Sequence, residues 1–111
     1  ELYIAALGAL KNTSVFMPLF SAFGPEPIQS RLEIAKARVL VTTDALYRRK
    51  VEAIRGAVPS VEHVLLIGEP SGTAGATGPG VHRLGSLMAD ADERFEIPAT
   101  DPEDPALLHF T

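Results

Sequence analysis

The stretch "RVLVTTDALYRRKVEAIRGAVPSVEHVLLI", residues 38–67, decides the fold because two apolar runs flank a helical segment. Residues 38–43 and 61–67 are each apolar over several consecutive positions, which is typical of strands buried on both faces. Between them, Thr43-Asp44 can cap a helix, and Gly56 and Pro59 have the chemistry of a helix end. This alternation of strand, helix and strand predicts a right-handed crossover within a parallel sheet.

Further elements are expected on both sides of this stretch. Residues 1–11 predict a helix that is apolar on nearly every side, and residues 14–19 a short or edge strand, because Pro18 cannot donate to a ladder. A second helix should begin at Gly24-Pro25 and bury Ile28, Leu32 and Ala35. The helix after Thr43 should bury the apolar residues at positions 46, 53, 54 and 57.

The last third of the chain is less regular. Residues 68–80 hold five Gly and two Pro in thirteen positions, which predicts a flexible surface loop. A short helix is expected over 81–92, with Leu84, Leu87 and Met88 turned inward, then an acidic, proline-rich connector over 93–105 and the start of a strand at 107–110. The fold class is therefore α/β: residues 1–111 form one segment with a partial parallel sheet and flanking helices in Rossmann- or flavodoxin-like layers.

Composition limits the classes of function. At 111 residues the chain suffices for one domain, and its apolar content of 46% argues against disorder. No apolar run is long enough for a membrane span, and no signal peptide is visible, so we expect a cytoplasmic protein without a membrane partner. The absence of Cys excludes disulfides and thiol chemistry. A net charge of -4 makes nucleic acid an unfavourable partner.

The usual catalytic motifs are missing. The Gly-rich loop has no Lys for a Walker motif, and its glycines lack dinucleotide-binding spacing. No nucleophile elbow occurs, so no catalytic residue is assigned. The three histidines, His63, His82 and His109, are far apart in sequence and without helical metal-site spacing, so they are expected to be isolated from one another and no metal site is predicted.

The segment "YRRK", residues 47–50, is the polar feature with most promise. Three adjacent cations on a helix spread over roughly 200° of its surface, so they cannot all bind one ligand. One or two of them follow the carboxyl end of a strand, where open α/β sheets bind ligands, and can hold a phosphate. The simpler interpretation is a solvated helix face.

Taken together, the chain resembles the AMP-forming acetyl-CoA synthetase branch of the acyl-CoA synthetases. The resemblance rests on "ELYIAALGALKNTSVFMPLFSAFGPEPIQSRLEIAKARVLVTTDAL", "PSVEHVLLIG" and "DPALLHFT". In that family a Leu-Gly-x-Leu-Lys-like helix end, Pro-Leu-Phe, a phenylalanine loop, an Arg-Leu pair and a strand ending in Thr occur in this order. They match residues 7–11, 18–20, 23, 31–32 and 39–42.

The resemblance implies a larger adenylate-forming domain. Such ligases convert a carboxylate such as acetate, ATP and coenzyme A to acyl-CoA, AMP and pyrophosphate with Mg²⁺, through an acyl-adenylate. In the family, Thr111 would open the ATP phosphate loop, and the magnesium ligand and catalytic Lys lie further on. We therefore expect a fragment of an N-terminal domain, inactive as a ligase by itself, that binds neither ATP, Mg²⁺ nor coenzyme A tightly.

By position, the resemblance also points to contacts with the nucleotide of coenzyme A. The family's phenylalanine loop lies beside the coenzyme, and an Arg after a Thr-x-Asp turn contacts its 3′-phosphate. This chain has Ser21 and Ala22 where glycines are common in the family. A second arginine of the family falls at Val51, and Arg49 or Lys50 can take the place of that arginine. The candidate residues are Phe20, Ser21, Ala22, Arg48, Arg49 and Lys50.

A rival hypothesis is a stand-alone flavodoxin-like module that binds an anionic partner through its basic helix. A fragment should expose apolar surface and tend to self-associate. A complete module should instead be monomeric and unfold cooperatively.

Overall fold

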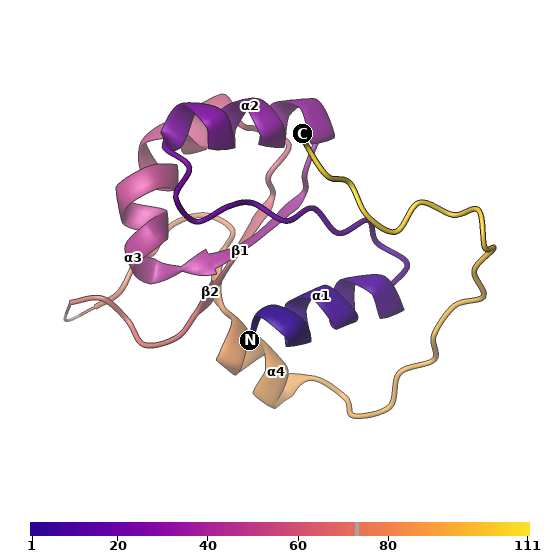
Figure 1. The fold of residues 1–111 in the computed structure, drawn as a ribbon. Helices are drawn as coiled ribbons and strands as arrows, with labels where there is room; N and C mark the ends of the chain where they lie inside the picture. The colour runs from indigo at the N-terminus through magenta and orange to yellow at the C-terminus, as the bar shows by residue number, and fades with distance from the viewer. Residues whose placement is uncertain (73) are drawn as a thin grey trace. The chain divides into compact units, whose positions relative to one another are not determined.

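The computed structural model describes residues 1–72 and 74–111. It divides into two compact units, one of residues Phe20–Ala91 and the other of Glu1–Leu19 with Asp92–Thr111 (Figure 1). None of its described helices is both long and apolar enough to cross a bilayer.

The larger unit is built on a three-stranded parallel sheet in the order β1-β2-β3. β1 (Val39–Thr43) pairs with β2 (His63–Ile67) along its whole length, and β2 pairs with β3 (Val81–Arg83). The predicted α/β class with a parallel sheet is thus confirmed. The third strand lies at the start of the segment expected to be helical, because a run of only three residues carries too little periodicity to be distinguished.

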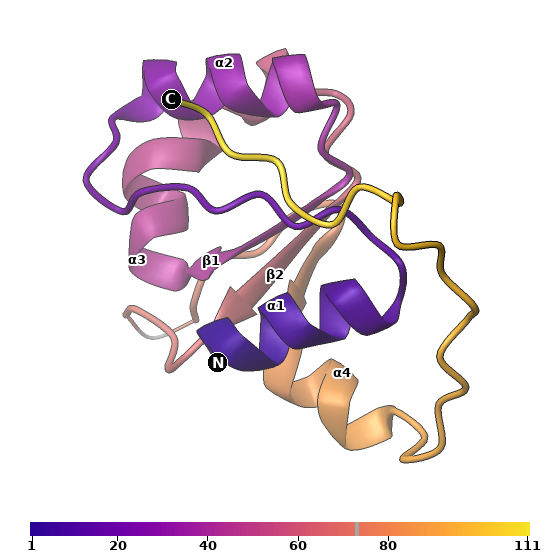
Figure 2. The same cartoon turned by 45° about the vertical axis from the view of Figure 1, so that its right-hand side comes forward.

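The helix before the sheet follows the prediction closely. α2 (Pro25–Ala35) has Pro at its first turn and buries Ile28 and Leu32, whereas Ala35, which was also expected to be buried, is only half-buried. The helix ends at Ala35, and the cap residue Lys36 adopts a left-handed conformation with φ of 51°. The helices α2 and α3 lie on the same side of the strands, as Figures 1 and 2 both show.

The connection from β1 to β2 is helical but irregular. It comprises α3 (Asp44–Leu46), the π-helical η1 (Tyr47–Val51) and the 3₁₀-helical η2 (Glu52–Ala57). The Leu46 backbone N–H donates to the Thr43 hydroxyl at 3.2 Å, so the predicted cap forms. The predicted apolar face is wrong: Tyr47 and Val51 are buried, and the residues at 46, 53, 54 and 57 are not. The change of helix type explains this, because each type turns by a different angle per residue.

The described core belongs entirely to this larger unit. Its members come from α2, from β1 and β2, from the connection between these two strands and from the loop after β2. The buried hydrophobic residues are Ile28, Leu32, Leu40, Tyr47, Val51, Val58, Val61, Val64, Leu66 and Ala76.

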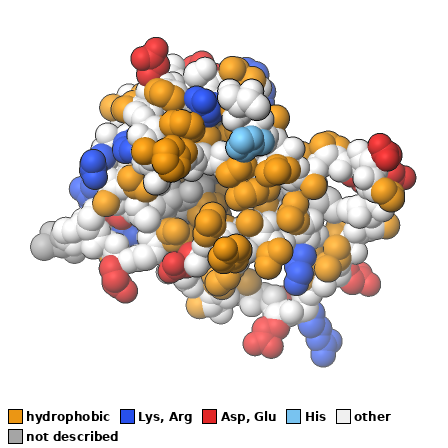
Figure 3. All heavy atoms as spheres, viewed as in Figure 1, with side chains coloured by type: hydrophobic (Ala, Val, Ile, Leu, Met, Phe, Trp, Pro, Cys, Tyr) orange, Lys and Arg blue, Asp and Glu red, His pale blue; other side chains and the backbone are white. Residues whose placement is uncertain are grey.

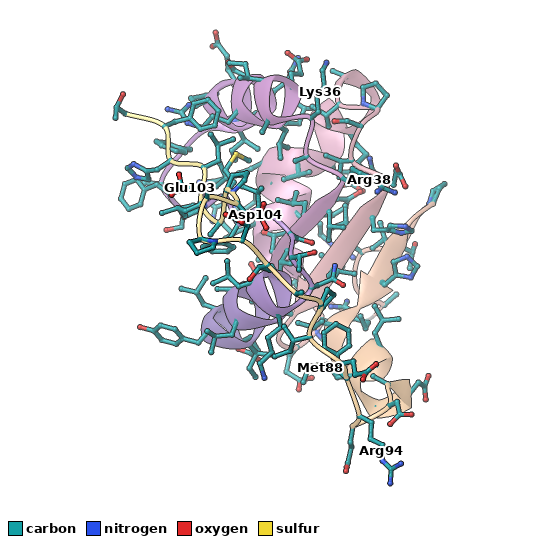
Figure 4. The ribbon with its side chains drawn as sticks, turned by 90° about the vertical axis from the view of Figure 1, so that its right-hand side faces the viewer. Lys36, Arg38, Met88, Arg94, Glu103 and Asp104 are labelled. Atoms are coloured by element: carbon teal, nitrogen blue, oxygen red, sulfur yellow. The ribbon has the colours of Figure 1, made fainter. Side chains whose placement is uncertain are left out.

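The larger unit ends in α4 (Leu84–Asp90), which directly follows β3. The predicted helix is therefore present, but none of its three expected inward residues is buried, and Leu84 is only half-buried. Leu87 and Met88 are exposed, and Figure 4 labels Met88 on this helix. A helix of seven residues offers less than two full turns for an apolar stripe to follow.

The smaller unit contains α1 (Leu2–Lys11), as predicted, but none of its residues is buried. Figure 3 shows exposed hydrophobic side chains on the face that carries α1. The strands expected at 14–19 and 107–110 are reduced to one parallel bridge between Phe16 and Leu107. In that bridge the Phe16 N–H donates to the Ala106 carbonyl, and the Leu108 N–H donates to the Phe16 carbonyl, both at 2.9 Å.

Candidate functional site

The carboxyl ends of the three parallel strands meet at one edge of the sheet. Asp44 follows β1 directly, the glycine-rich loop 68–80 follows β2, and Arg83 is the last residue of β3. The strand register places Thr43 opposite Ile67, and Leu66 opposite Arg83. Open α/β sheets bind their ligands beyond this edge. The described residues there are the first candidates for a site.

Asp44 is the centre of this edge, with a side chain only 1% exposed. Its Oδ1 accepts hydrogen bonds from the Ala76 N–H at 2.5 Å and from Arg83 Nη2 at 2.8 Å. Its Oδ2 accepts from Arg48 Nε at 3.1 Å, from the Ser71 N–H at 3.2 Å and from the Ser71 hydroxyl. One carboxylate therefore ties the helix after β1, the loop after β2 and the end of β3 together.

These donors also fix the charge of Asp44. The Ala76 N–H, the Ser71 hydroxyl and N–H, and the Arg83 guanidinium hold the pKa of Asp44 well below its ordinary value, although burial opposes them. The group is therefore a carboxylate at neutral pH. It is suited to holding cations and N–H groups in place, not to donating or accepting a proton in a reaction.

The three cations of residues 48–50 perform three different tasks. Arg48 pairs with Asp44 through its Nε, while its side chain remains 43% exposed. Lys50 Nζ donates to the carbonyls of Ser21 at 2.6 Å and Phe23 at 2.8 Å. Arg49 is exposed and has no hydrogen-bond or ionic partner among the described residues. The prediction that the three cannot all serve one ligand agrees with this arrangement.

Lys50 places the phenylalanine loop beside the basic helix. Phe20 and Phe23 meet edge to face with ring centroids 5.8 Å apart, and Arg31 lies over the Phe23 ring at 4.4 Å. Phe20 itself stays 66% exposed, so one aromatic ring is open to a ligand. The structure thus brings together the loop of Phe20, Ser21 and Ala22 and the helix with Arg48, Arg49 and Lys50.

Two residues of this edge were not foreseen from the sequence. Asp44 was interpreted only as part of a helix cap, and Arg83 was assigned no role. An acidic residue directly after a buried strand was the available signal for Asp44. No local signal marks Arg83, because its partner lies 39 positions away in the sequence. The anchoring of loop 68–80, including the burial of Ala76, was likewise not foreseen.

The expectation that the histidines are isolated from one another is wrong for two of them. His63 Nδ1 and His82 Nε2 lie 3.2 Å apart on β2 and β3. Parallel pairing brings the two together although 19 positions separate them in sequence. No cluster of three or more metal-binding side chains occurs in the part of the chain that the structure describes.

The opposite end of the sheet is charged but open to solvent. Lys36 follows the last residue of α2, and Arg38 precedes the first residue of β1. Figure 4 labels both residues. Arg38 forms two hydrogen bonds to Glu62, at 3.0 and 3.1 Å. These bonds lower the pKa of Glu62 and raise that of Arg38. Both side chains are largely exposed, so this pair is a weak candidate for a site.

Comparisons with known proteins agree with one another. The acetyl-coenzyme A synthetase of Bacillus subtilis is 34% identical over 112 residues, which cover the whole chain and 18% of that protein. A human mitochondrial acyl-coenzyme A synthetase is 24% identical over 111 residues, again the whole chain and 18% of the relative. The crystal structure of Brucella canis acyl-CoA synthetase superimposes with a TM-score of 0.79 and 26% identity, covering 99% of this chain and 19% of that one.

No family model matches the sequence. The chain spans less than a fifth of the length of the relatives above, and it corresponds throughout to one segment of them. The comparisons of sequence and of fold nevertheless agree. Over its whole length the chain is similar to one segment of acetyl-CoA and acyl-CoA synthetases.

Proposed function

We propose that this chain is part of an AMP-forming acyl-CoA ligase and forms one wall of the site for the nucleotide end of coenzyme A. The whole protein would join acetate or another short carboxylate to coenzyme A, with ATP and Mg²⁺, through an acyl-adenylate. The similarity to acetyl-CoA and acyl-CoA synthetases supports the reaction class. We assign none of the ATP or Mg²⁺ contacts of the whole ligase to these residues. The 111 residues alone are expected to release no pyrophosphate from ATP and acetate.

The observation that carries the proposed wall is the pair of hydrogen bonds from Lys50 to Ser21 and Phe23. They hold an exposed aromatic ring next to a helix whose Arg48 has outward-facing cationic surface. An aromatic face can stack on a base, and a guanidinium binds a phosphate through several donors. The two groups together suit an adenine nucleotide that carries a phosphate.

The geometry also divides the work among the six candidate residues. Arg48 is assigned to the phosphate and Phe20 to the base. Lys50 donates its hydrogen bonds to carbonyls of the phenylalanine loop, so its role is to hold that loop in position. Ser21 offers its carbonyl to Lys50, while Ala22 and Arg49 border the ligand.

The test uses the whole synthetase that contains this segment. Arg48→Ala should raise the KM for coenzyme A about tenfold, the loss expected when one charge-assisted contact is removed. The control Arg38→Ala removes a guanidinium from the opposite end of the sheet and should leave that KM unchanged. The proposal is wrong if the protein forms no AMP from ATP, carboxylate and coenzyme A. The proposed wall is wrong if Arg48→Ala leaves the KM for coenzyme A unchanged.

A further inference from the structure

The His63–His82 pair joins two neighbouring strands on one face of the sheet. His63 is the first residue of β2, and His82 is the middle residue of β3. His82 lies opposite Leu65, two positions after His63, so both rings project from the same face. The distance from His63 Nδ1 to His82 Nε2 is 3.2 Å, and the ring planes are inclined by 44°. The sheet thus brings one nitrogen from each imidazole to the same place.

This separation is one that two ligands of a single metal ion can have. Metal–imidazole bonds measure about 2.0–2.1 Å. At a tetrahedral angle such bonds place the two nitrogens about 3.3–3.4 Å apart, and at a right angle about 2.9 Å apart. The observed 3.2 Å lies between these values. A hydrogen bond between the rings has a similar length, so an ion can take the place of its proton with little movement of either ring.

Both rings are available to a ligand. The pair is open to solvent, and neither ring makes a further hydrogen bond among residues 1–72 and 74–111. The backbone beside them is held closely. The Val64 N–H donates to the Gly80 carbonyl at 2.8 Å, and a Cβ added at Gly80 would overlap the Glu62 carbonyl oxygen. An ion would therefore meet two ligands whose strands are already in register, which lowers the cost of ordering them.

The surrounding charges determine which class of ion the pair can hold. Glu62 is occupied by Arg38 at 3.0 and 3.1 Å, and Arg55 donates to the carbonyls of Val61 and Glu62. Two guanidiniums therefore offset the one nearby carboxylate, and the described residues add no third histidine or carboxylate to the pair. Mg²⁺ and Ca²⁺ require several oxygen ligands and are disfavoured. Imidazole nitrogen suits Zn²⁺, Ni²⁺ and Cu²⁺, and Cu²⁺ binds most tightly of the three.

We propose that His63 and His82 form a two-histidine site for a divalent transition-metal ion, with Cu²⁺ bound most tightly. His63 Nδ1 and His82 Nε2 are the protein ligands, and water completes the coordination. The bound ion links β2 to β3 and stabilises a strand of only three residues. The prediction of no metal site assumed that the histidines are isolated, and the pair removes that premise. None of the residues assigned to coenzyme A takes part.

Calorimetric titration of the whole synthetase with Cu²⁺ tests the site. His63→Ala and His82→Ala should each weaken the tightest Cu²⁺ binding about hundredfold, because the second imidazole of a chelate acts at a high effective concentration. The double variant should lose far less than the sum of the two single losses. His109→Ala is the matched control and should keep the affinity of the unmodified protein. Unchanged affinity in the two single variants, or additive losses, overturns the proposal.

Pulsed electron paramagnetic resonance counts the imidazoles on Cu²⁺ added below one equivalent. The unmodified synthetase should show two, each single variant at most one, and excess Mg²⁺ should not change the spectrum. One imidazole in the unmodified protein, or two that persist in both variants, contradicts the site. ATP–pyrophosphate exchange checks that each variant folds, and either variant alone suffices for the count. Because both measurements report metal binding, their failure leaves the proposed coenzyme wall untouched.

Discussion

Each of the two compact units contains a helix of similar length, but only the helix of the larger unit buries hydrophobic side chains. In the unit of residues 20–91, α2 is polar over most of its surface, and its Leu32 is 0% exposed. In the other unit, α1 is far more hydrophobic, and yet its Leu7 is 58% exposed. A core thus requires an opposing surface, which the parallel sheet provides for α2, and apolar composition alone does not supply it.

The largest expected effect contrasts one leucine from each unit. Leu66→Ala in β2 removes a side chain that is 1% exposed and should cost about 2–5 kcal/mol in the free energy of unfolding. Leu7→Ala in α1 removes an exposed side chain and should cost less than about 0.5 kcal/mol. Urea titrations followed by circular dichroism give both values. Equal losses would show that α1 contributes to the same core, against the division drawn here.

A second prediction concerns the loop of the larger unit and compares two glycines with positive φ. Gly72 (φ 81°) has open space around it, so Gly72→Ala should cost about 1–2 kcal/mol for the backbone alone. Gly75 (φ 67°) lies against Arg83, so Gly75→Ala adds a steric clash to the same backbone cost. Its free energy of unfolding should therefore fall further. Similar losses in the free energy of unfolding would mean that the loop and the Arg83 side chain can move apart at little cost.

Acid should weaken the larger unit through Asp44. The pKa of this carboxyl is lowered by folding, so the unfolded chain binds more protons below the ordinary value of about 3.9. Stability from Asp44 is complete above that pH and is lost as the pH falls toward the folded pKa. Urea midpoints measured from pH 6 to pH 2 should fall less steeply in Asp44→Asn than in the unmodified chain. Parallel curves would show that Asp44 does not contribute to the acid dependence.

The smallest expected effect lies within the larger unit, at the solvent-exposed end of its sheet. Arg38→Ala breaks both hydrogen bonds to Glu62, but the two side chains are 74% and 49% exposed. Exposed ion pairs contribute little to stability, so the urea midpoint should stay within experimental error. A clear loss here would mean that burial is not what makes Asp44 important. The comparison between the two ends of the sheet would then fail.

The parts of the fold that were predicted correctly are those with a long local pattern. The stripe of α2 and the apolar runs of β1 and β2 each repeat over enough residues to show their period. The predictions failed where tertiary pairing decides the structure, as at β3, which has three residues, and at the bridge between Phe16 and Leu107. The buried face of the helix after β1 was missed because its geometry passes from α to π to 3₁₀.

The candidate site shows the same limit more clearly. Arg48 and the phenylalanine loop were predicted because a family pattern marks them in order along the chain, and their contact with coenzyme A stays a prediction. Arg83 could not be found, because only the parallel sheet brings it to Asp44. The role of Lys50 also depends on a contact 29 and 27 positions away, with the carbonyls of Ser21 and Phe23.

The His63–His82 pair gives the molecule a natural spectroscopic reporter. When the two ring nitrogens lie 3.2 Å apart, one imidazole must donate and the other accept, which fixes the two tautomers relative to each other. Nitrogen-15 chemical shifts of the rings distinguish these tautomers. Because the rings sit on neighbouring strands, loss of the pairing between β2 and β3 would release both tautomers at once. The separation of these two strands can thus be followed without any introduced label.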